Sequence, residues 1–450
     1  MTLHEIFEEP VWPENPRSLI SPFSYGRYVA NIHDFGSGRL IHSRGFDTMF
    51  AEYVTTKPAL DGVKRVFQTV VRCPFPKAKI RVQIESRSKQ NVLTPVFETT
   101  IDPSSHVIRR ETVPQQDLVI EIQNLGSCHD QVDVLFLAEG YTLDDSDKFK
   151  GDLQRMTDFM FSQEPYRDLK DRFNIRGLFR ASSEQGTDEP RQHRFKSTAL
   201  NSTYNIFDID RYLLLEDNHA MHRMAAQVPY DTIVVLVNTK RYGGGGICLD
   251  YCAATVDHAA SPLVFLHEFG HSFAYLADEY TGDVSYNDMF PVGVEPIEPN
   301  ITRELNRDRI KWKAFLTPDV ALPTPNPEDD VIRLQAELKA GNTATRKKLQ
   351  AAASEGLQDT EIQTIKDTWN VEKQTLEEML MAAQQRLPET SGIVGAFEGG
   401  GYLKKGIYRA EQSCWMGSLD PETGFCVVCQ DAIRRMIVFH SDRRGAITVP

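Results

Sequence analysis

The chain has 450 residues, of which 41% are hydrophobic, and carries a formal net charge of −13 at pH 7. This length and apolar content predict two or three folded domains with a substantial core. The acidic balance, with no basic stripe to neutralise phosphates, argues against nucleic acid as a partner. No window reaches the roughly eighteen apolar residues of a membrane span, so no transmembrane segment is predicted.

Residues 1–125 are predicted to form an N-terminal domain rich in β-structure. Three segments alternate apolar with polar residues at period two: residues 65–71, 80–84 and 118–122. This alternation is typical of half-buried antiparallel strands, and helical spacing is scarce in this part of the chain. We therefore expect an antiparallel β-sandwich.

From residue 126 the pattern changes to alternating strands and helices. Apolar runs and amphipathic stretches predict strand, helix, strand, helix and strand in turn over residues 132–138, 144–161, 173–181, 209–226 and 232–237. Such an alternation predicts an α/β domain over residues 126–450, with a sheet behind the motif-bearing helix that follows.

Four consecutive glycines, Gly243, Gly244, Gly245 and Gly246, follow the last of these strands. A phosphate-binding loop would continue with lysine and then serine or threonine, but Ile247 comes next, so the sequence gives no support for a nucleotide site. Two alternatives remain. The glycines form a flexible turn or bulge, or their backbone approaches a substrate closely and pairs with it as an added strand.

The pentapeptide HEFGH at residues 267–271 is the strongest motif in the chain. An apolar run that begins after Pro262 precedes it, which predicts a buried helix with proline in its first turn. Residues four apart lie on one helical face about 6 Å apart, so His267 and His271 can bind one Zn²⁺, with Glu268 beside the open coordination position. A chance match is the alternative, but burying Glu268 between two histidines without a cation would be costly.

A zinc ion held by two histidines needs a third protein ligand. In the pattern HExxHxxGxxH this ligand lies ten residues after the first histidine, a position that Ala277 occupies here. Asp278 and Glu279 follow, and we expect Asp278 to be the ligand, with Glu279 as the alternative. On a straight helix Asp278 would lie about 10 Å along the axis from His271, so the helix must break near Ala274.

Residues 327–388 are rich in Ala, Glu, Gln, Lys and Leu and predict an inserted helical arm. Three helices are expected within it, over residues 329–339, 344–353 and 360–386. Gly341 and Gly356 are the predicted breaks between them. A solvated hairpin that packs on its neighbour is the simpler interpretation, and a partner-binding or substrate-restricting role is the alternative.

Seven cysteines are too few and too scattered for a disulfide scaffold. Cys426 and Cys429 form a CxxC motif, with Cys414 upstream and His440 downstream. This set could hold a second, structural zinc ion. An exported protein would more often form one disulfide there, and buried free thiols are a further alternative, so a second zinc is not expected.

Taken together, these motifs resemble the bacterial metallopeptidases typified by immunoglobulin A peptidase. The segments that carry the resemblance are residues 134–141, 230–231, 237–238, 242–246, 267–280, 414–416 and 425–429. The resemblance implies a metzincin-like catalytic domain behind an N-terminal β-rich domain. It also implies that Met416 is the methionine of the turn beneath the metal, with plain core packing as the alternative. The N-terminus lacks the pattern of a signal peptide, which fits either a cytoplasmic protein or one whose leader is absent from this chain; the resemblance implies export to the cell surface, the periplasm or the medium.

The predicted protein is an α+β multidomain zinc endopeptidase. Its N-terminal β-sandwich precedes a metzincin-like α/β zinc-peptidase domain with an inserted helical hairpin. Zn²⁺ would lower the pKa of its water, and Glu268 would act as general base in the cleavage of a protein or peptide substrate. Two alternatives are a non-catalytic adhesion or glycan-binding protein with a structural zinc, and a zinc amidase acting on cell-wall material. The sequence predicts neither the oligomeric state nor the bond that is cleaved. The resemblance does not identify immunoglobulin as the substrate, because a shared fold does not fix substrate specificity.

Overall fold

The computed structural model describes residues 1–110, 116–282, 289–355, 358–386 and 390–442. The chain divides into two compact units. The first unit consists of Met1–Glu304, Gly399–Ile407 and Cys414–Pro450, and the second of Leu305–Glu398 and Tyr408–Ser413. The domain boundary predicted near residue 125 lies within the first unit and stays a prediction. None of the described helices combines the length and the apolar character needed to cross a membrane.

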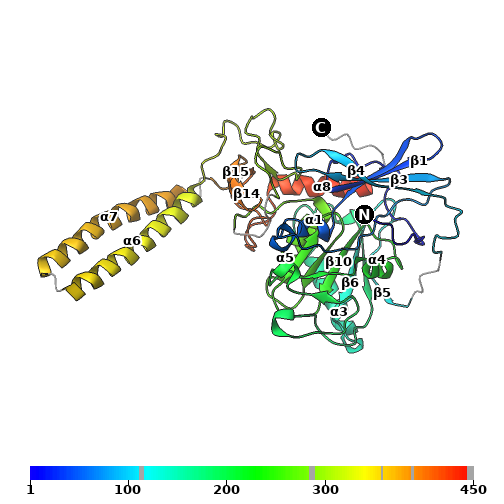
Figure 1. The fold of residues 1–450 in the computed structure, drawn as a ribbon, viewed down its shortest axis with the longest axis horizontal. Helices are drawn as coiled ribbons and strands as arrows, with labels where there is room; N and C mark the ends of the chain where they lie inside the picture. The colour runs from blue at the N-terminus through cyan, green and yellow to red at the C-terminus, as the bar shows by residue number, and fades with distance from the viewer. Residues whose placement is uncertain (111–115, 283–288, 356–357, 387–389, 443–450) are drawn as a thin grey trace. The chain divides into compact units, whose positions relative to one another are not determined.

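The N-terminal part of the first unit is built on an antiparallel sheet with the strand order β2-β1-β3-β4 (Figure 1). Its strands are β1 (Tyr28–Asp34), β2 (Leu40–Phe46), β3 (Ile80–Arg87) and β4 (Leu93–Ile101). Alternate residues of β1 and β3 face a small apolar core, as strand periodicity requires: Tyr28, Ala30, Ile32, Ile80, Val82 and Ile84. Two short helices follow β2, namely α1 (Met49–Tyr53) and α2 (Lys57–Leu60).

The described residues 1–110 form this one sheet, whereas a sandwich needs two facing sheets. The strand predicted over residues 65–71 is wrong, because no strand pairs with this segment. Instead, the Val70 N–H donates to the side chain of Asn218 (3.0 Å). The strand predicted over residues 118–122 exists as β5 (Leu118–Gln123), but it pairs with β7 (Phe173–Phe179) of the next sheet.

A mixed sheet of six strands forms the centre of the first unit, in the order β11-β12-β10-β6-β7-β5. The strands not yet given are β6 (Val132–Glu139), β10 (Thr232–Val237), β11 (Gly244–Ile247) and β12 (Tyr251–Thr255). The four inner strands run parallel, and β11 and β5 run antiparallel at the two edges. Every residue of the inner strands is buried, as is usual for parallel strands covered on both faces.

Helices cover both faces of this sheet (Figure 1). They are α3 (Ser146–Ser162), α4 (Asn218–Ala225), α5 (Ser261–Ala274) and α8 (Val427–Ser441). On one face, Phe136 of β6 packs against Phe265 of α5, with ring centroids 5.6 Å apart. The preceding residue of β6, Leu135, faces the opposite side and shares a core with Met221 of α4. The helix α5 is thus held against the β11 end of the sheet, where it contacts β11 and β12.

The helix predicted over residues 209–226 is shorter than expected. Leu214–Leu215 form strand β9, which pairs with β8 (Ser202–Thr203). Asp217 then caps α4 by accepting a hydrogen bond from the Ala220 N–H (2.9 Å). A further sheet has the order β13-β15-β14, with β13 (Ile301–Thr302), β14 (Phe397–Gly400) and β15 (Leu403–Arg409).

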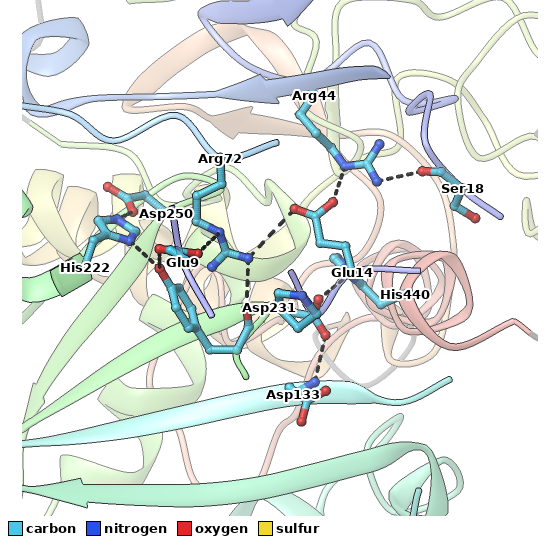
Figure 2. Close-up of polar contacts among 12 residues, drawn as sticks. Glu9, Glu14, Ser18, Arg44, Arg72, Asp133, His222, Asp231, Asp250 and His440 are labelled. Atoms are coloured by element: carbon cyan, nitrogen blue, oxygen red, sulfur yellow. Dashed lines mark hydrogen bonds and ion pairs between the residues drawn. The ribbon is translucent and has the colours of Figure 1, made fainter. Parts of the chain in front are cut away.

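A buried polar network joins the N-terminal segment to the four-stranded and the six-stranded sheets of the first unit (Figure 2). Glu14 accepts a hydrogen bond from Arg44 of β2 (Nε–Oε2 2.8 Å) and lies 3.9 Å from the Arg72 guanidinium. Arg72 also lies 3.9 Å from the Glu9 carboxylate and donates to the Tyr230 carbonyl (2.9 Å), just before β10. The N-terminal segment is therefore fixed to the six-stranded sheet by charge.

Two long helices dominate the second unit, α6 (Pro327–Glu355) and α7 (Asp359–Arg386). They lie side by side as a hairpin (Figure 1) and share a small core of Val331, Leu334 and Ala383. The predicted break at Gly341 is wrong, because α6 continues through this residue. A Cβ at Gly341 would lie 1.9 Å from the Trp369 ring, so the glycine makes room for close packing. The predicted break at Gly356 lies outside the described residues.

Candidate metal centre

The two histidines of the HEFGH segment face each other on α5. Pro262 lies in the first turn of this helix, and the residues around the motif are buried, so the helix is anchored along most of its surface. His267 and His271 are one turn apart, and their Nε2 atoms are separated by 3.2 Å. Each ring is about nine-tenths buried, with 12% of its side chain exposed.

Helix α5 ends at Ala274, where the spacing of the motif required a break. Tyr275 has a left-handed backbone conformation (φ 57°, ψ 33°) and turns the chain back towards the histidines. The side chain of Asn300 then holds both backbone groups of Ala277, at 2.8 and 2.9 Å. This brings Asp278 Oδ1 to 3.1 Å from His267 Nε2 and 3.4 Å from His271 Nε2. The Glu279 side chain does not point at the two histidines.

The outer atoms of these three side chains are held by hydrogen bonds. His267 Nδ1 lies 2.8 Å from the Trp415 carbonyl, and His271 Nδ1 lies 2.6 Å from the Leu276 carbonyl. A carbonyl only accepts, so both Nδ1 atoms carry a proton, and in the neutral rings both Nε2 atoms present a lone pair. The hydroxyl of Tyr402 donates to Asp278 Oδ2, which leaves Oδ1 directed at the two imidazoles.

Three acceptor atoms therefore converge in a buried space, an arrangement that requires positive charge. Their separations of 3.1, 3.2 and 3.4 Å match the edges of a tetrahedral zinc site, about 3.3 Å for bonds of about 2.0–2.1 Å. Without a metal, burial acts to lower the pKa of His271, but the Asp278 carboxylate outweighs it and raises the pKa to about 9. The residues thus fit a cation, supplied by a proton or by a metal ion.

Glu268 lies beside this cluster. Its carboxylate and the two imidazoles present atoms within 4.8 Å of one another. Burial raises the pKa of Glu268, although the neighbouring histidines act to lower it. A carboxylate with a raised pKa next to a metal site has the basicity needed to take a proton from water near neutral pH.

The four glycines allow β11 to lie directly on α5. A Cβ at Gly244 would be 2.5 Å from Val264, and a Cβ at Gly246 would be 2.8 Å from the Glu268 carbonyl. A Cβ at Gly243 or at Gly245 would likewise be too close to a tyrosine ring. Because Gly244–Ile247 form a regular strand, the interpretation as a flexible turn is wrong for these residues. The glycines place the strand edge against the HEFGH helix.

Met416 is fully buried and packs against the HEFGH helix. Its sulfur would lie 3.0 Å from a Cβ at Gly270, so the two fit only because residue 270 has no side chain. Its carbonyl accepts the Glu279 N–H (2.7 Å), which links this segment to the chain after α5. The position suits a methionine beneath the metal centre, and that role stays a prediction.

Protein-family models match most of this chain. A family model described as IgA Peptidase M64 matches residues 120–437, and one described as Peptidase M64 N-terminus matches residues 1–98. The chain belongs to the IgA peptidase M64 family. The resemblance predicted from the motifs is confirmed, and membership supports a metallopeptidase, a hydrolase of peptide bonds. No match was found among curated proteins.

Sequence reasoning missed several groups at the centre of this M64 peptidase. Tyr402, which orients Asp278, comes more than 120 residues later, beyond the helical arm. Tyr280 interacts electrostatically with Arg211, Asp278 and Glu268. The glycine run before Tyr402 was a signal, because it allows the tight backbone there (Tyr402 φ 66°). Nothing in the sequence around Arg211 points to the centre.

All seven cysteines of the M64 chain lie in the described residues, where each is a free thiol and none forms a disulfide. Cys414, Cys426 and Cys429 come together, as their spacing suggested. His440 does not join them, because its Nδ1 lies 3.3 Å from Asp231 Oδ1 in a different part of the unit (Figure 2). Glu279, the alternative zinc ligand, lies with the cysteines instead.

Proposed function

We propose that this M64 peptidase is a zinc-dependent endopeptidase whose metal is held by His267, His271 and Asp278. The convergence of three buried acceptor atoms at tetrahedral spacing supports this assignment more than any other observation. The sheet with an antiparallel edge strand, the helix α5 beside it and the buried Met416 agree with a metzincin-like catalytic domain.

The side chains around the centre divide the chemistry among them. A zinc ion bound there would supply a Lewis acid that lowers the pKa of water and polarises the substrate carbonyl. Glu268 takes the proton of the attacking water and passes it to the leaving amine. The Tyr280 hydroxyl, which interacts electrostatically with Arg211 and Asp278, would be a hydrogen-bond donor to the developing oxyanion.

The edge of β11 provides a place for the substrate backbone. In an antiparallel pair, residues two apart direct their backbone groups to the same side. The Gly244 carbonyl points outward, where it accepts the Leu213 N–H (3.2 Å). Gly246 has the same outward direction and lies against Glu268, so an extended peptide pairing there would have a bond beside the metal.

The test separates metal binding from turnover. In Glu268→Gln the metal content should equal that of the wild type, while cleavage of unfolded protein substrates falls at least about 10³-fold, because the general base is lost. His271→Ala should lose one metal ion and all cleavage. Glu422→Gln, an exposed carboxylate, is the matched control and should behave as the wild type. Normal cleavage by Glu268→Gln would remove Glu268 from the mechanism.

A further inference from the structure

A second cluster of metal-binding side chains lies next to the first. Cys414, Cys426, Cys429 and Glu279 are each at most 3% exposed. The sulfurs of Cys414 and Cys429 are 3.7 Å apart, and Glu279 Oε1 lies 3.2 Å from Cys429 Sγ and 4.0 Å from Cys426 Sγ. All four ligand atoms lie within 4.8 Å of one another.

The backbone around the cysteines donates hydrogen bonds to their sulfurs. Cys414 Sγ accepts the N–H groups of Met416 (3.5 Å) and Cys426 (3.3 Å). Cys426 Sγ accepts the Cys429 N–H at the start of α8 (3.4 Å). Donors aimed at sulfur favour thiolates, and thiolate is the form of cysteine that binds metals.

Neither of the ordinary alternatives accounts for all four groups. A disulfide between two of these cysteines would leave the third thiol and the Glu279 carboxylate buried together. Apolar packing accounts for three buried thiols, but the Glu279 carboxylate, which is 1% exposed and accepts a hydrogen bond from Asn300 (Nδ2–Oε1 2.8 Å), is also directed at their sulfurs. In contrast, a tetrahedral zinc ion with Zn–S bonds of about 2.3 Å needs sulfur atoms about 3.8 Å apart, and the Cys414 and Cys429 sulfurs are 3.7 Å apart.

We propose that Cys414, Cys426, Cys429 and Glu279 form a second, structural zinc site. Four protein ligands fill the coordination shell and leave no position for water, which is the mark of a structural rather than a catalytic zinc. Thiolate ligands select zinc over magnesium or calcium. The site extends beyond the proposed peptidase centre and does not depend on it.

This site would brace the first centre through three short connections. Cys414 is followed by Trp415, whose carbonyl holds His267, and by Met416, whose carbonyl holds the Glu279 N–H. Glu279 in turn is adjacent to Asp278. A metal bound to the second cluster therefore joins the turn after α5, the Met416 segment and the start of α8, and it fixes two of the three ligands of the first centre.

Cobalt substitution tests the proposal on the full chain, because thiolate-bound Co²⁺ has a charge-transfer absorption that histidine and carboxylate ligands lack. The wild type should bind two metal ions per chain and show this absorption. Three thiols should become reactive only after chelation. His271→Ala should lose one ion and cleavage but keep the absorption, so failure of the peptidase assignment would not affect the result.

Variants of the cluster give the matched comparison. Cys429→Ser should lose the absorption and one metal ion, and its cleavage rate should fall because Asp278 and His267 are less well held. Cys252→Ala, which removes a buried thiol outside the cluster, should keep the absorption. If Cys429→Ser does not fold, the wild-type measurements still decide. One metal ion without charge-transfer absorption, or a disulfide among the three cysteines, would overturn the proposal.

Discussion

Asp278 and Glu279 are neighbours in the chain, yet their carboxylates point into different clusters. The backbone of these two residues runs between the segments that contain Gly401 and Met416. The Asp278 carbonyl accepts the Gly401 N–H (2.8 Å), and the Glu279 N–H donates to the Met416 carbonyl (2.7 Å). Successive side chains of such an extended segment point to opposite sides. One extra residue before Asp278, compared with the pattern HExxHxxGxxH, is taken up by the left-handed turn at Tyr275.

Replacing the two carboxylates one at a time should separate the two clusters. Asp278→Ala should lose the metal of the histidine centre and reduce cleavage at least about 10²-fold, because two imidazoles alone hold zinc weakly. Glu279→Ala should keep that metal but weaken cobalt–thiolate absorption. Metal analysis, absorption and cleavage measured on both variants give the comparison. Equal metal loss in both would show that the carboxylates serve one site.

Tyr402 should act on the metal through Asp278. Its hydroxyl occupies Asp278 Oδ2 and so keeps Oδ1 towards the histidines. Tyr402→Phe should therefore weaken metal affinity or activity about 10–100-fold, as is usual when a group that orients a metal ligand is removed. The measurement is competition with a chelator of known affinity. Tyr53→Phe, which loses a hydrogen bond to Val63 in the N-terminal part, is the control and should retain wild-type affinity.

The sequence identifies the residues on α5 but not the groups that orient them. His267, Glu268 and His271 share one helix, so their spacing alone predicts that they lie together. Tyr402 and the Trp415 carbonyl reach the centre through tertiary folding across more than 120 residues. A backbone carbonyl carries no sequence signal at all, because any residue could supply it. The choice of Asp278 over Glu279 likewise depends on the turn at Tyr275.

At the scale of elements, buried apolar strands were the most predictable. The strands β6, β7 and β10 begin where their apolar runs begin, because both of their faces are covered. Residues 65–71 show equally good alternation but find no partner strand, and periodicity cannot reveal partners. The helix predicted over residues 209–226 starts later than predicted. Asp217 caps α4 at its N-terminus, and Leu214–Leu215 pair with β8 as strand β9, so these local interactions outweigh the helical spacing.

The contact between β11 and α5 should not tolerate a single added methyl group. Gly246→Ala would place a Cβ 2.8 Å from the Glu268 carbonyl, and neither backbone can move without disturbing the centre. We expect a loss of about 1–3 kcal/mol in stability, together with reduced kcat. Gly151→Ala, at an open position of α3, should instead stabilise the protein by about 0.5–1 kcal/mol. Denaturant unfolding and steady-state kinetics on both variants are the measurements.

On the scale of the whole molecule, segments far apart in sequence meet at a few charged groups. The N-terminal segment contributes Glu9 and Glu14, which face Arg72 and Arg44 (Figure 2). Each guanidinium also donates to backbone carbonyls, so both charges have several partners. Such a network is strongly destabilised when one partner is removed, since the opposite charge stays buried.

The contribution of Glu14 to folding should disappear in acid. Burial acts to raise the pKa of Glu14, but Arg44, His42 and Arg72 outweigh it and lower the pKa from 4.5 to about 2. Because the folded pKa lies below the unfolded one, the stabilisation is complete above about pH 4.5 and is lost as the pH falls towards 2. The difference corresponds to about 3 kcal/mol.

Glu14→Gln measures this contribution directly. Denaturant unfolding of the variant and the wild type at pH 7 should differ by about 3 kcal/mol or more, since Gln cannot balance the two guanidinium charges. Near pH 3 the gap should shrink, because Glu14 is then protonated in the unfolded wild type but still ionised in the folded one, so folding releases less free energy through this charge. Acid also releases metal, but it does so in both proteins and cancels in the comparison. A gap that stays constant between pH 7 and pH 3 would mean that Glu14 acts through packing and not through its charge.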